Sequence, residues 1–456
     1  MQVSHEPVTA PTPVFDEDHL VAAGGLPAIL GLAEQADFIS LLAGRLTVDC
    51  PNAPLKARSL VAGMLAGADD IDGTGILRTG GTPKVMGGVR APSTLGTFLR
   101  SFTHGHVLQL GAVNRKLLEH LAPVVPGLFG ADPLITVDLD DTIRELHGYR
   151  KQGVAYGYNK VKGLNAILAV VSSDSCPPVI TGAGLRRGNV KSGDHAAWHA
   201  TRSITLARTV RPGTQILGRA DSAFCTCETI HAFADHGCWF SVTIPAWPTV
   251  TAAISGIDEQ AWTPIRYPHA VIEPETGELI SDAEVAETPF TAFVSHPKDE
   301  QVSCRLVVRR VKRLNPAGQD PLVESYRYHA FITNSDLDTV EADRRHRDHA
   351  IVEQVIAELK AGPLAHLPSG RFTANAAWLA CAVIAFNLSR AAAHAAGMST
   401  ARMPTITRRL IMIPARIAHR ARRRYLHMPR RWPWATQFTR LWTTATAVGP
   451  PLALAS

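Results

Sequence analysis

The sequence predicts an α/β fold in which a mixed sheet lies between helical regions at the two ends of the chain. Three observations support this expectation. Apolar runs of strand length lie between residues 131 and 246, helical apolar spacing precedes and follows them, and further strand-like segments lie between residues 247 and 335. A hydrophobic content of 46% and a charged content of 19% are typical of a globular chain, and 456 residues predict more than one domain.

The first 130 residues have no strong strand pattern. Residues 1–20 contain several prolines and are expected to form a flexible lead. They lack a basic patch followed by an apolar run, so we do not expect a secretory signal. Residues 21–130 have the apolar spacing of several short helices, which predicts a helical N-terminal domain.

Strand and helix patterns follow one another in a definite order between residues 131 and 246. Three strands come first, and then helix, strand, helix and strand. These patterns lie near residues 134–142, 164–173, 177–185, 193–210, 213–224, 226–237 and 239–245. With a final helix in residues 336–365, this is the order of a ribonuclease-H-like fold. The block at 247–335 is then a β-rich insertion into that fold, and residues 366–456 follow it as an arginine-rich helical region.

Carboxylates are clustered in the first predicted strand. Asp138 and Asp140 project from one face of that strand, because side chains alternate along it, and Asp141 follows at once. Asp221 ends a second strand in the segment GRADSAF. Reactive groups collect at the carboxyl ends of strands in open α/β sheets, so we expect Asp140 and Asp221 to lie side by side. The alternative for both residues is N-capping or turn formation after a strand.

A third carboxylate is expected from the late helix. Glu353 and Lys360 are seven residues apart and therefore share a face of that helix. We expect Glu353 to lie among the packing residues, where an unpaired carboxylate would be costly. Glu358, on a different face, is the alternative. Three carboxylates held together repel one another, which predicts a site for Mg²⁺ or Mn²⁺, with two ions per site.

Positive charge is concentrated at the end of the chain. The last acidic residue is Glu358, and residues 361–456 contain thirteen arginines and no lysine, aspartate or glutamate. The preceding part of the chain has 33 basic and 40 acidic residues. Such asymmetry indicates a nucleic-acid partner, with a solvated basic helix face as the alternative.

Several short motifs resemble those of one protein family. VDLDDT looks like a first-aspartate motif, an Asp-x-Thr that maps onto Asp140 and Thr142, and GRADSAF is similar to a second-aspartate motif that contains Asp221. DDIDGTGILRTGG, APSTLGTFLRSF and RRWPWA are similar to segments near the two ends of such chains. In this order the motifs resemble a DDE transposase of bacterial insertion sequences, in the family numbered thirteen-eighty. The resemblance covers nearly the whole chain.

The resemblance implies a site and a reaction. Asp140, Asp221 and Glu353 become the catalytic and metal-binding residues, with Asp138 and Thr142 as supporting or alternative residues. The implied reaction is hydrolytic cleavage at terminal inverted repeats, followed by attack of the released 3′-hydroxyl on target DNA. The partners are double-stranded DNA at the element ends and at the target, and synapsis of two ends implies a homodimer on DNA. Residues 21–130 are then expected to bind DNA ends, although plain helical packing would explain them equally well.

The family that the chain resembles belongs to a wider group whose catalytic domain carries an inserted β-sheet, and the motif around the third carboxylate departs from the pattern of that group. That pattern, YxxRxxxExxxxxxK, keeps its glutamate and lysine here as Glu353 and Lys360. Its tyrosine and arginine positions hold His346 and His349. The resemblance implies that Lys360 and His349 contact DNA phosphates, with His346 as a further DNA contact, and a histidine does so as a cation only when protonated. Arg345 or Arg347 is the alternative contact.

Arginines of the C-terminal region are expected to contact DNA phosphates. They are Arg408, Arg409, Arg416, Arg420, Arg422, Arg423, Arg424, Arg430 and Arg431. Seven scattered cysteines favour reduced thiols, which predicts a cytoplasmic, nucleoid-associated protein. No window of about 18 apolar residues stands out, so we expect no membrane partner. The other readings of the chain are a catalytically decayed protein that only binds inverted repeats, or a metal-dependent nuclease without strand transfer.

Overall fold

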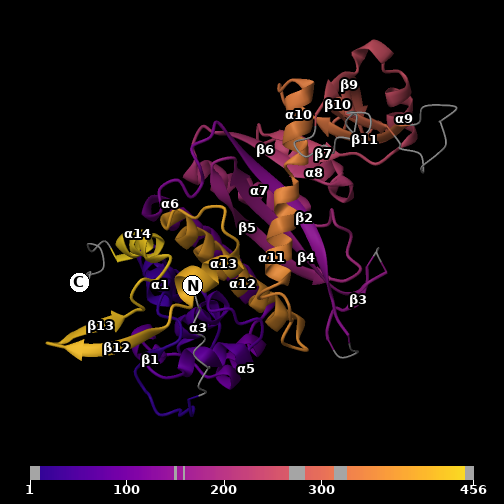
Figure 1. Ribbon diagram of the computed structural model, residues 1–456. Coiled ribbons are helices and arrows are strands. Elements are labelled where there is room, and N and C mark those ends of the chain that lie inside the picture. Colours follow the sequence, from indigo (N-terminus) through magenta and orange to yellow (C-terminus); the bar gives the residue numbers. More distant parts are fainter. Residues whose placement is uncertain (1–10, 148–150, 158–159, 267–282, 313–325, 447–456) are drawn as a thin grey trace.

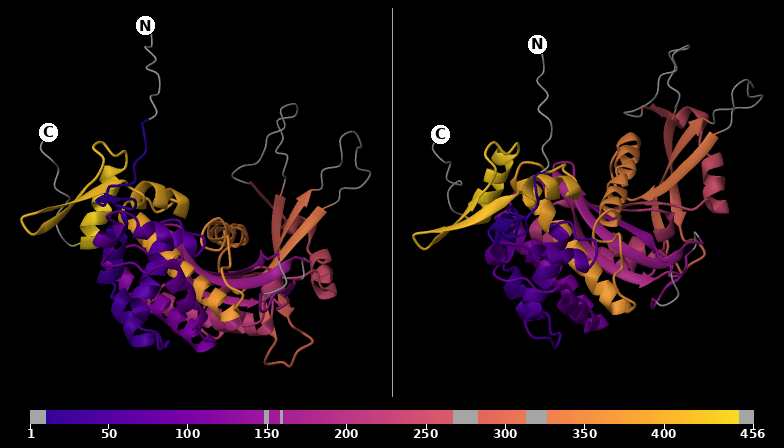
Figure 2. Two further views of the ribbon diagram at one scale, coloured as in Figure 1. Left: turned by 90° about the horizontal axis from the view of Figure 1, so that it is seen from below. Right: turned by 60° about the horizontal axis from the view of Figure 1, so that its bottom comes forward.

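The computed structural model describes residues 11–147, 151–157, 160–266, 283–312 and 326–446 (Figure 1). Helices from both ends of the chain pack together at one end of the molecule, and a sheet crosses its middle. The strands that follow residue 262 build the opposite end. Figure 2 shows the same arrangement from two further directions.

Five strands form the centre of the sheet. The central strand, β2 (Leu134–Glu145), pairs antiparallel with β4 (Lys162–Ser173) and parallel with β6 (Gln215–Ala220). β5 (Cys176–Arg187) lies outside β4 and is antiparallel to it, and β7 (Trp239–Thr243) lies outside β6 and is parallel to it. The order is therefore β5-β4-β2-β6-β7, and the strand segments predicted from the sequence are confirmed as strands.

The sequence of β2 explains why it occupies the centre. Ile135, Val137 and Leu139 are buried on one face, as the period of two requires. α7 (Ala196–Val210) contacts β2, and η2 (Ser222–Phe224) and α8 (Cys227–Ala234) follow β6. The opposite face of β2 carries Asp138 and Asp140. This face is in contact with the late helix α11 (Ala350–Lys360).

The strand-rich segment extends the same sheet. β11 (Tyr326–Thr333) pairs antiparallel with β7, β10 (Val302–Lys312) pairs with β11, and β9 (Ala283–Ala292) with β10. The edge strand β8 (Thr263–Ile265) completes it. This block also contains the helix α9 (Pro248–Ser255) and the turn η3 (Glu259–Ala261), and β3 (Ala155–Tyr156) lies at the opposite edge beside β4. Residues 267–282 and 313–325 of the predicted β-rich block lie outside the described residues.

The predicted helical character of residues 21–130 is confirmed. The helices are α1 (Leu26–Gln35), α2 (Phe38–Arg45), α3 (Ala53–Leu65), η1 (Asp72–Arg78), α4 (Thr82–Met86), α5 (Pro92–Arg100) and α6 (His104–Val124). Segments from the other end of the chain complete this part. α12 (Phe372–Ala395) contacts α3 and α6, α14 (Ala435–Thr446) contacts α1, and β1 (Leu20–Val21) pairs with β12 (Ala415–Arg420). The two ends of the chain therefore build one packed unit.

The expectation of a wholly helical C-terminal region is wrong. α13 (Met403–Ile406) and the π-helical turn η4 (Thr407–Ile411) are followed by a β-hairpin of β12 and β13 (Arg423–His427). Ala421 and Arg422 form its turn with positive φ angles of 46° and 65°, which suits a tight hairpin. The signal was the alternation of buried Ala415 and Ile417 with exposed residues, a strand period inside a segment dominated by its charge.

The late helix is divided. α10 (Thr339–Arg347) and α11 replace the single helix expected in residues 336–365, with Asp348 and His349 at the break. His349 keeps right-handed backbone angles of −56° and −22°, so the chain continues in nearly the same direction. The face of α11 predicted from residue spacing is therefore preserved.

α12 corrects the expectation that no long apolar window exists. This helix of 24 residues is long and apolar enough to cross a membrane, but 94% of its apolar window is buried inside the protein. Its polar residues have partners in the protein. Asn387 accepts a hydrogen bond from the backbone N–H of Ile180 and donates to the Ile180 carbonyl and to Asn114, each at 2.8 Å. These bonds attach α12 and α6 to β5 where its register with β4 shifts.

A buried ion pair joins α11 to α12. Glu358 accepts from Nη2 of Arg390 at 2.6 Å and from the backbone N–H of Met403 at 2.7 Å. Both charged side chains are almost fully buried, at 4% and 1% exposure. Glu358 therefore stabilises the fold, and the alternative that assigned it to the catalytic site is wrong.

Replacing Glu358 by Ala should lower the free energy of unfolding by about 3–5 kcal/mol, because Arg390 would remain buried without its anion. The measurement is urea unfolding followed by circular dichroism. Glu353→Ala is the matched control on the same helix, and its exposed position predicts a change within about 0.5 kcal/mol. Equal effects of the two substitutions would contradict the assignment.

Candidate active site

Two carboxylates lie where the parallel pairing of β2 with β6 ends, although β2 itself continues to Glu145, so Asp140 is not at the end of its strand as expected. β2 and β6 are parallel, and their register pairs Leu139 with Ala220. Asp140 is the next residue of β2 and Asp221 follows the last residue of β6, so the parallel pairing places the two residues next to each other. The charge of Asp221 contributes to a raised pKa of Asp140, which reflects this proximity.

Asp140 is in an environment that disfavours its charge. Partial burial is the largest cause that raises its pKa to about 7, and the charges of Asp221 and Asp141 add to it. His349 acts in the opposite direction. One carboxylate oxygen accepts the backbone N–H of Asp141 at 2.7 Å. Within the described part of the chain, Asp140 forms no ion pair, so its charge lacks a direct counterion.

Asp221 combines a structural contact with an exposed carboxylate. Its Oδ1 accepts the backbone N–H of Ala223 at 2.9 Å and caps the short helical turn η2. Asp221 therefore does act as an N-cap, which was the alternative predicted from the sequence. This contact uses only one of its two carboxylate oxygens. The surroundings partly desolvate the carboxylate and raise its pKa, and the charge of Asp141 adds to this effect.

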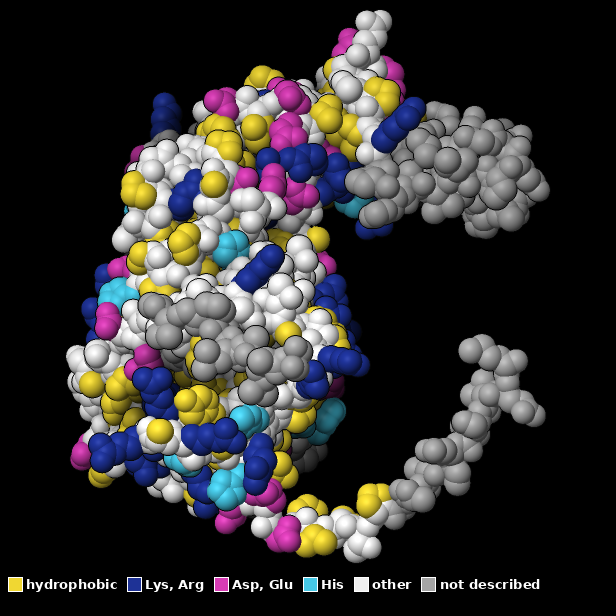
Figure 3. All heavy atoms as spheres, turned by 60° about the vertical axis from the view of Figure 1, so that its left-hand side comes forward, with side chains coloured by type: hydrophobic (Ala, Val, Ile, Leu, Met, Phe, Trp, Pro, Cys, Tyr) yellow, Lys and Arg dark blue, Asp and Glu magenta, His cyan; other side chains and the backbone are white. Residues whose placement is uncertain are grey.

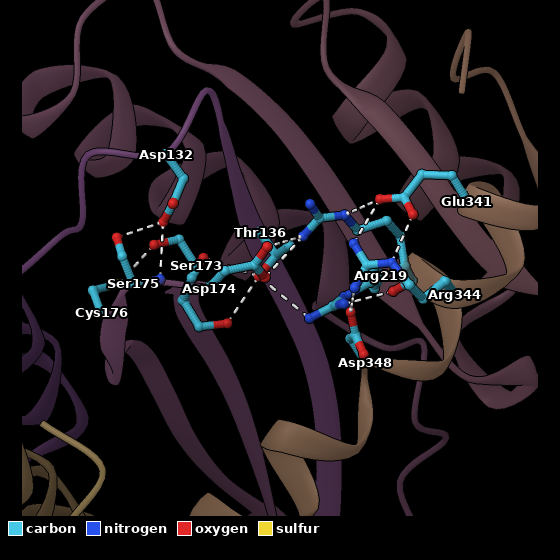
Figure 4. Close-up of polar contacts among 12 residues, drawn as sticks. Asp132, Thr136, Ser173, Asp174, Ser175, Cys176, Arg219, Glu341, Arg344 and Asp348 are labelled. Carbon is cyan, nitrogen blue, oxygen red and sulfur yellow. Dashed lines mark hydrogen bonds and ion pairs between the residues drawn. The ribbon is translucent and has the colours of Figure 1, made fainter. Parts of the chain in front are cut away.

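Asp138 differs from Asp140 although both lie on the same face of β2. It is fully buried and receives Nε and Nη2 of Arg219 at 2.7 and 2.8 Å. Nδ1 of His349 lies 2.8 Å from its Oδ1. Burial alone would raise the pKa of Asp138, but the charge of Arg219 and the bond to His349 lower it. Asp138 is therefore an internal counterion, and Figure 4 shows Arg219 also reaching Thr136.

Asp141 and Thr142 complete this part of β2. Asp141 projects to the other face, where it pairs with Arg186 and accepts from Asn165 at 2.9 Å. Thr142 is half-buried and lies two residues beyond Asp140 on the same face. Asp138, Asp140 and Asp141 are close neighbours on β2. Asp138 and Asp141 each have an arginine partner, and Asp140 has none in the described structure.

Sequence reasoning missed the two arginines that hold these aspartates. Arg219 is paired with Asp138 in the register of β2 and β6, so the two face each other across adjacent strands. The signal was present, because each residue stands two positions before a predicted catalytic aspartate. Arg186 on β5 reaches Asp141 across β4, and that contact depends on a strand order that spacing alone does not specify.

Glu353 lies on the face of α11 that meets β2. His349 and Lys360 stand four residues before it and seven after it, and these spacings place all three on one face. His349 bonds Asp138, and Lys360 interacts electrostatically with Asp140. Glu353 is exposed, so the expectation that it lies among packing residues is wrong. The ligand atoms of Asp140, Asp221 and Glu353 are not all within 4.8 Å of one another in the described structure.

His346 makes contacts that stabilise the fold. Its Nδ1 lies 2.8 Å from Oγ of Ser241 and its Nε2 lies 3.0 Å from Oγ1 of Thr243. Its ring stacks on Phe331 with 4.1 Å between centroids. Burial, with nearby positive charges, lowers its pKa to about 3, so the ring is neutral. The suggestion that His346 contacts DNA as a cation is therefore not supported by its surroundings.

The arginines beside His346 are in ion pairs. Arg345 binds Asp174 at 2.9 Å and Glu341 at 2.8 Å, and Arg347 binds Asp343 at 2.8 Å. Figure 4 shows the related contacts of Arg344 with Glu341 and Asp348. A phosphate contact by Arg345 or Arg347 would have to compete with these acids.

The C-terminal arginines are mostly exposed, and many lie on the hairpin β12–β13. The hairpin projects from the helical end of the molecule (Figure 2). Figure 3 shows Lys, Arg and His side chains gathered on the corresponding face. The exposed predicted arginines are Arg408, Arg416, Arg420, Arg422, Arg423, Arg424, Arg430 and Arg431. Arg409 is half-buried, with its guanidinium 4.8 Å from the ring centroid of Trp434.

The sequence and the structure can both be compared with those of known proteins. One solved structure with detectable similarity is described as a cryo-EM structure of the piggyBac transposase synaptic complex with hairpin DNA. It shares 11% identity with this chain at a TM-score of 0.34, over 83% of this chain and 70% of that chain. No curated protein matches the sequence. Residues 57–448 match the family described as "Transposase DDE domain group 1", and the chain therefore belongs to this family of DDE transposases.

Proposed function

We propose that this chain cleaves DNA at the terminal inverted repeats of a bacterial insertion sequence and joins the 3′-hydroxyl ends to target DNA. Asp140, Asp221 and Glu353 are the proposed catalytic residues. The observation that carries the proposal is the pair Asp140 and Asp221, which lie where the parallel pairing of β2 with β6 ends, and α11, which carries an exposed glutamate and contacts β2. Membership of a DDE transposase family supports a DNA-cutting and joining enzyme.

The strand order supports a ribonuclease-H-like core. β5-β4-β2-β6-β7 contains three antiparallel strands followed by two parallel ones, with helices after β5, β6 and the final strand-rich block. In this reading β8 to β11 are an insertion that extends the sheet through the pairing of β7 with β11. The insertion therefore continues the sheet on the side of the strand that carries Asp221.

The donor set fits Mg²⁺ or Mn²⁺. Carboxylate oxygens are the ligands that these ions prefer, and Asp140 lacks a counterion in the described structure although its charge is disfavoured. Asp140, Asp221 and Glu353 would hold the ions, and we propose two per site. When bound, such ions activate an attacking hydroxyl and stabilise the leaving oxygen of a phosphodiester.

The surrounding residues position this donor set. His349 bonds Asp138 at the start of α11, which attaches the helix to β2 one turn before Glu353. Arg219 neutralises Asp138, so that this aspartate adds little negative charge beside Asp140. Lys360 lies near Asp140 at the other end of the same helix face, where a phosphate of bound DNA would meet a positive charge. His349 is the second candidate for a phosphate contact there.

DNA is the proposed partner of the hairpin β12–β13. The side chains of Arg420, Arg422 and Arg423 have no hydrogen bond or ion pair within the described residues, and all three residues are exposed. A two-stranded ribbon with unpaired arginines at its tip is suited to phosphate contacts along a DNA groove. We extend the proposal to a homodimer on DNA and to a cytoplasmic, nucleoid-associated protein, because joining two element ends requires two sites.

Removing any one proposed ligand should abolish chemistry and leave DNA binding intact. Asp140→Asn, Asp221→Asn and Glu353→Gln are each expected to reduce Mn²⁺-dependent nicking of supercoiled plasmid by roughly a thousandfold, since several kcal/mol of transition-state stabilisation would be lost. Asp49→Asn, an exposed aspartate between α2 and α3, is the control.

Nicking that survives loss of Asp221 would contradict the three-carboxylate mechanism. A strand-joining assay with end DNA separates the remaining readings. A nuclease without strand transfer would nick but not join, and a decayed protein would bind end DNA and do neither.

The raised pKa of Asp140 predicts a stability effect that depends on pH. Its folded pKa of about 7 lies above the ordinary 3.8, so ionisation destabilises the fold progressively between these values and fully above pH 7. Without divalent ions, Asp140→Asn should therefore raise the melting temperature at pH 8, and the gain should vanish below pH 4. Mg²⁺ at pH 8 should stabilise the wild type more than the variant. A variant no more stable than wild type at pH 8 would contradict this environment for Asp140.

The hairpin should contribute to the salt dependence of DNA binding. Arg422→Gln with Arg423→Gln should reduce the slope of log affinity against log salt by up to about 1.8, because each phosphate contact contributes about 0.9. The measurement is fluorescence anisotropy with end DNA at several salt concentrations. Arg187→Gln with Arg327→Gln removes two exposed arginines outside both regions that are expected to bind DNA, as a charge-matched control. An equal loss of slope in both double variants would indicate a general charge effect.

A further inference from the structure

A second cluster of ligand side chains lies outside the three proposed catalytic carboxylates. Cys227, His296 and Glu300 each offer one ligand atom, and these atoms all lie within 4.8 Å of one another. Among the His, Cys, Asp and Glu residues that the structure describes, no other group of three meets this criterion. We propose that this cluster binds one Zn²⁺ ion that joins the strand-rich insertion to the core.

The ligands come from two segments that are far apart in the chain. Cys227 begins α8, and its side chain is largely buried. His296 and Glu300 belong to the turn between β9 and β10, and both are exposed. The Sγ of Cys227 lies 3.3 Å from the backbone carbonyl of Glu300, so the turn rests directly on the start of the helix. Solvent can reach the two exposed ligands, which gives an ion a route of entry.

The turn is held in place by its own hydrogen bonds. The backbone N–H of His296 donates to Phe293 at 2.8 Å, and that of Glu300 donates to Pro297 at 3.0 Å. Nε2 of Gln301 donates to the carbonyl of His296 at 3.0 Å. The ligands are therefore presented by an ordered backbone, which lowers the entropy cost of binding an ion.

The chemistry of the cluster indicates zinc. One thiolate, one imidazole and one carboxylate are zinc ligands, whereas Mg²⁺ prefers oxygen ligands alone. Tetrahedral zinc bonds of about 2.0–2.3 Å place ligand atoms about 3.3–3.7 Å apart. Nδ1 of His296 and Oε2 of Glu300 are 2.8 Å apart, so small side-chain rotations would admit the ion. The thiolate of Cys227 and the carboxylate of Glu300 together balance its double positive charge.

His231 is the proposed fourth ligand, and its ring would have to turn toward the ion, because it is not among the three residues whose ligand atoms lie within 4.8 Å of one another. It stands four residues after Cys227 on α8, and therefore on the same face of the helix. Its Nε2 lies 3.4 Å from the Glu300 carbonyl that Cys227 also contacts, and its Nδ1 lies 3.3 Å from Oδ1 of Asp235. A histidine that donates one ring nitrogen to a carboxylate and directs the other to a metal is a frequent zinc arrangement. Asp235 is then a positioning residue for His231.

A bound ion would stabilise the fold near the proposed catalytic residues. α8 follows η2, which Asp221 caps, so the ion would fix the turn between β9 and β10 against the segment that begins at Asp221. Structural zinc sites contribute folding free energy directly. This inference concerns a different ion and different residues from the proposed catalytic site, and it stands or falls independently of the transposition chemistry.

The test is the metal content of the full-length, tag-free protein produced in zinc-supplemented medium and purified without chelators. Mass spectrometry of the metals should give about one zinc per chain in the wild type. Cys227→Ser and Glu300→Gln should lose it, and Asp235→Asn should weaken zinc affinity about 10–100-fold in competition with a chelating dye. Replacement by Co²⁺ should give a thiolate-to-metal absorption band that Cys227→Ser lacks.

Cys225→Ser is the matched control, because Cys225 is buried two residues before Cys227 and lies outside the cluster. It should keep zinc and the cobalt band. Glu300 is exposed, so Glu300→Gln tests the site even if Cys227→Ser folds poorly. A wild type without zinc, or equal zinc in the wild type and Glu300→Gln, would overturn the proposal. Loss of nicking in a zinc-loaded protein would instead count against the proposed transposase function.

Discussion

The buried contact of Asp138 with Arg219 and His349 is the interaction on which the arrangement of the candidate site depends. It joins three elements that are distant in the sequence, because Asp138 lies on β2, Arg219 on β6 and His349 at the start of α11. A buried carboxylate is stable only when its charge is compensated, and here two partners compensate it. The contact therefore joins β2, β6 and α11, which are the elements that carry Asp140, precede Asp221 and carry Glu353.

Three neighbouring aspartates of β2 show how environment separates chemically identical groups. Asp138 is buried with a lowered pKa, and Asp141 pairs with Arg186 on the opposite face. Asp140 has neither partner, and its pKa is raised to about 7. A carboxylate whose charge the fold leaves uncompensated is the one prepared to receive a cation. This contrast supports Asp140 over Asp138 as the proposed ligand.

The two ends of the chain share one packed unit, which also carries the exposed arginines. α12 runs through the N-terminal helices, and its Asn387 satisfies the backbone of β5. β12 pairs with β1, so the hairpin that presents Arg420, Arg422 and Arg423 is attached to the start of the chain. The buried residues of the hairpin form a small cluster of their own with Val21, and Val85 and Met428 pack against both this cluster and the main core.

The sequence by itself determined the strands of the sheet, the helical N-terminal part, the adjacency of Asp140 with Asp221 and the common face of Glu353 with Lys360. The strands, the helices and the common helix face follow from local periodicity, and the adjacency of the two aspartates follows from the order of strands and helices along the chain. Only the tertiary structure decided that Glu358 pairs with Arg390, that His346 is neutral and bonded, and that residues 415–427 form a hairpin. The tertiary structure also decided which residues contact Asp138 and that Cys227 lies beside His296 and Glu300. The physical reason is that the ionisation and the partners of a side chain depend on neighbours brought together by packing, and no local pattern encodes these neighbours.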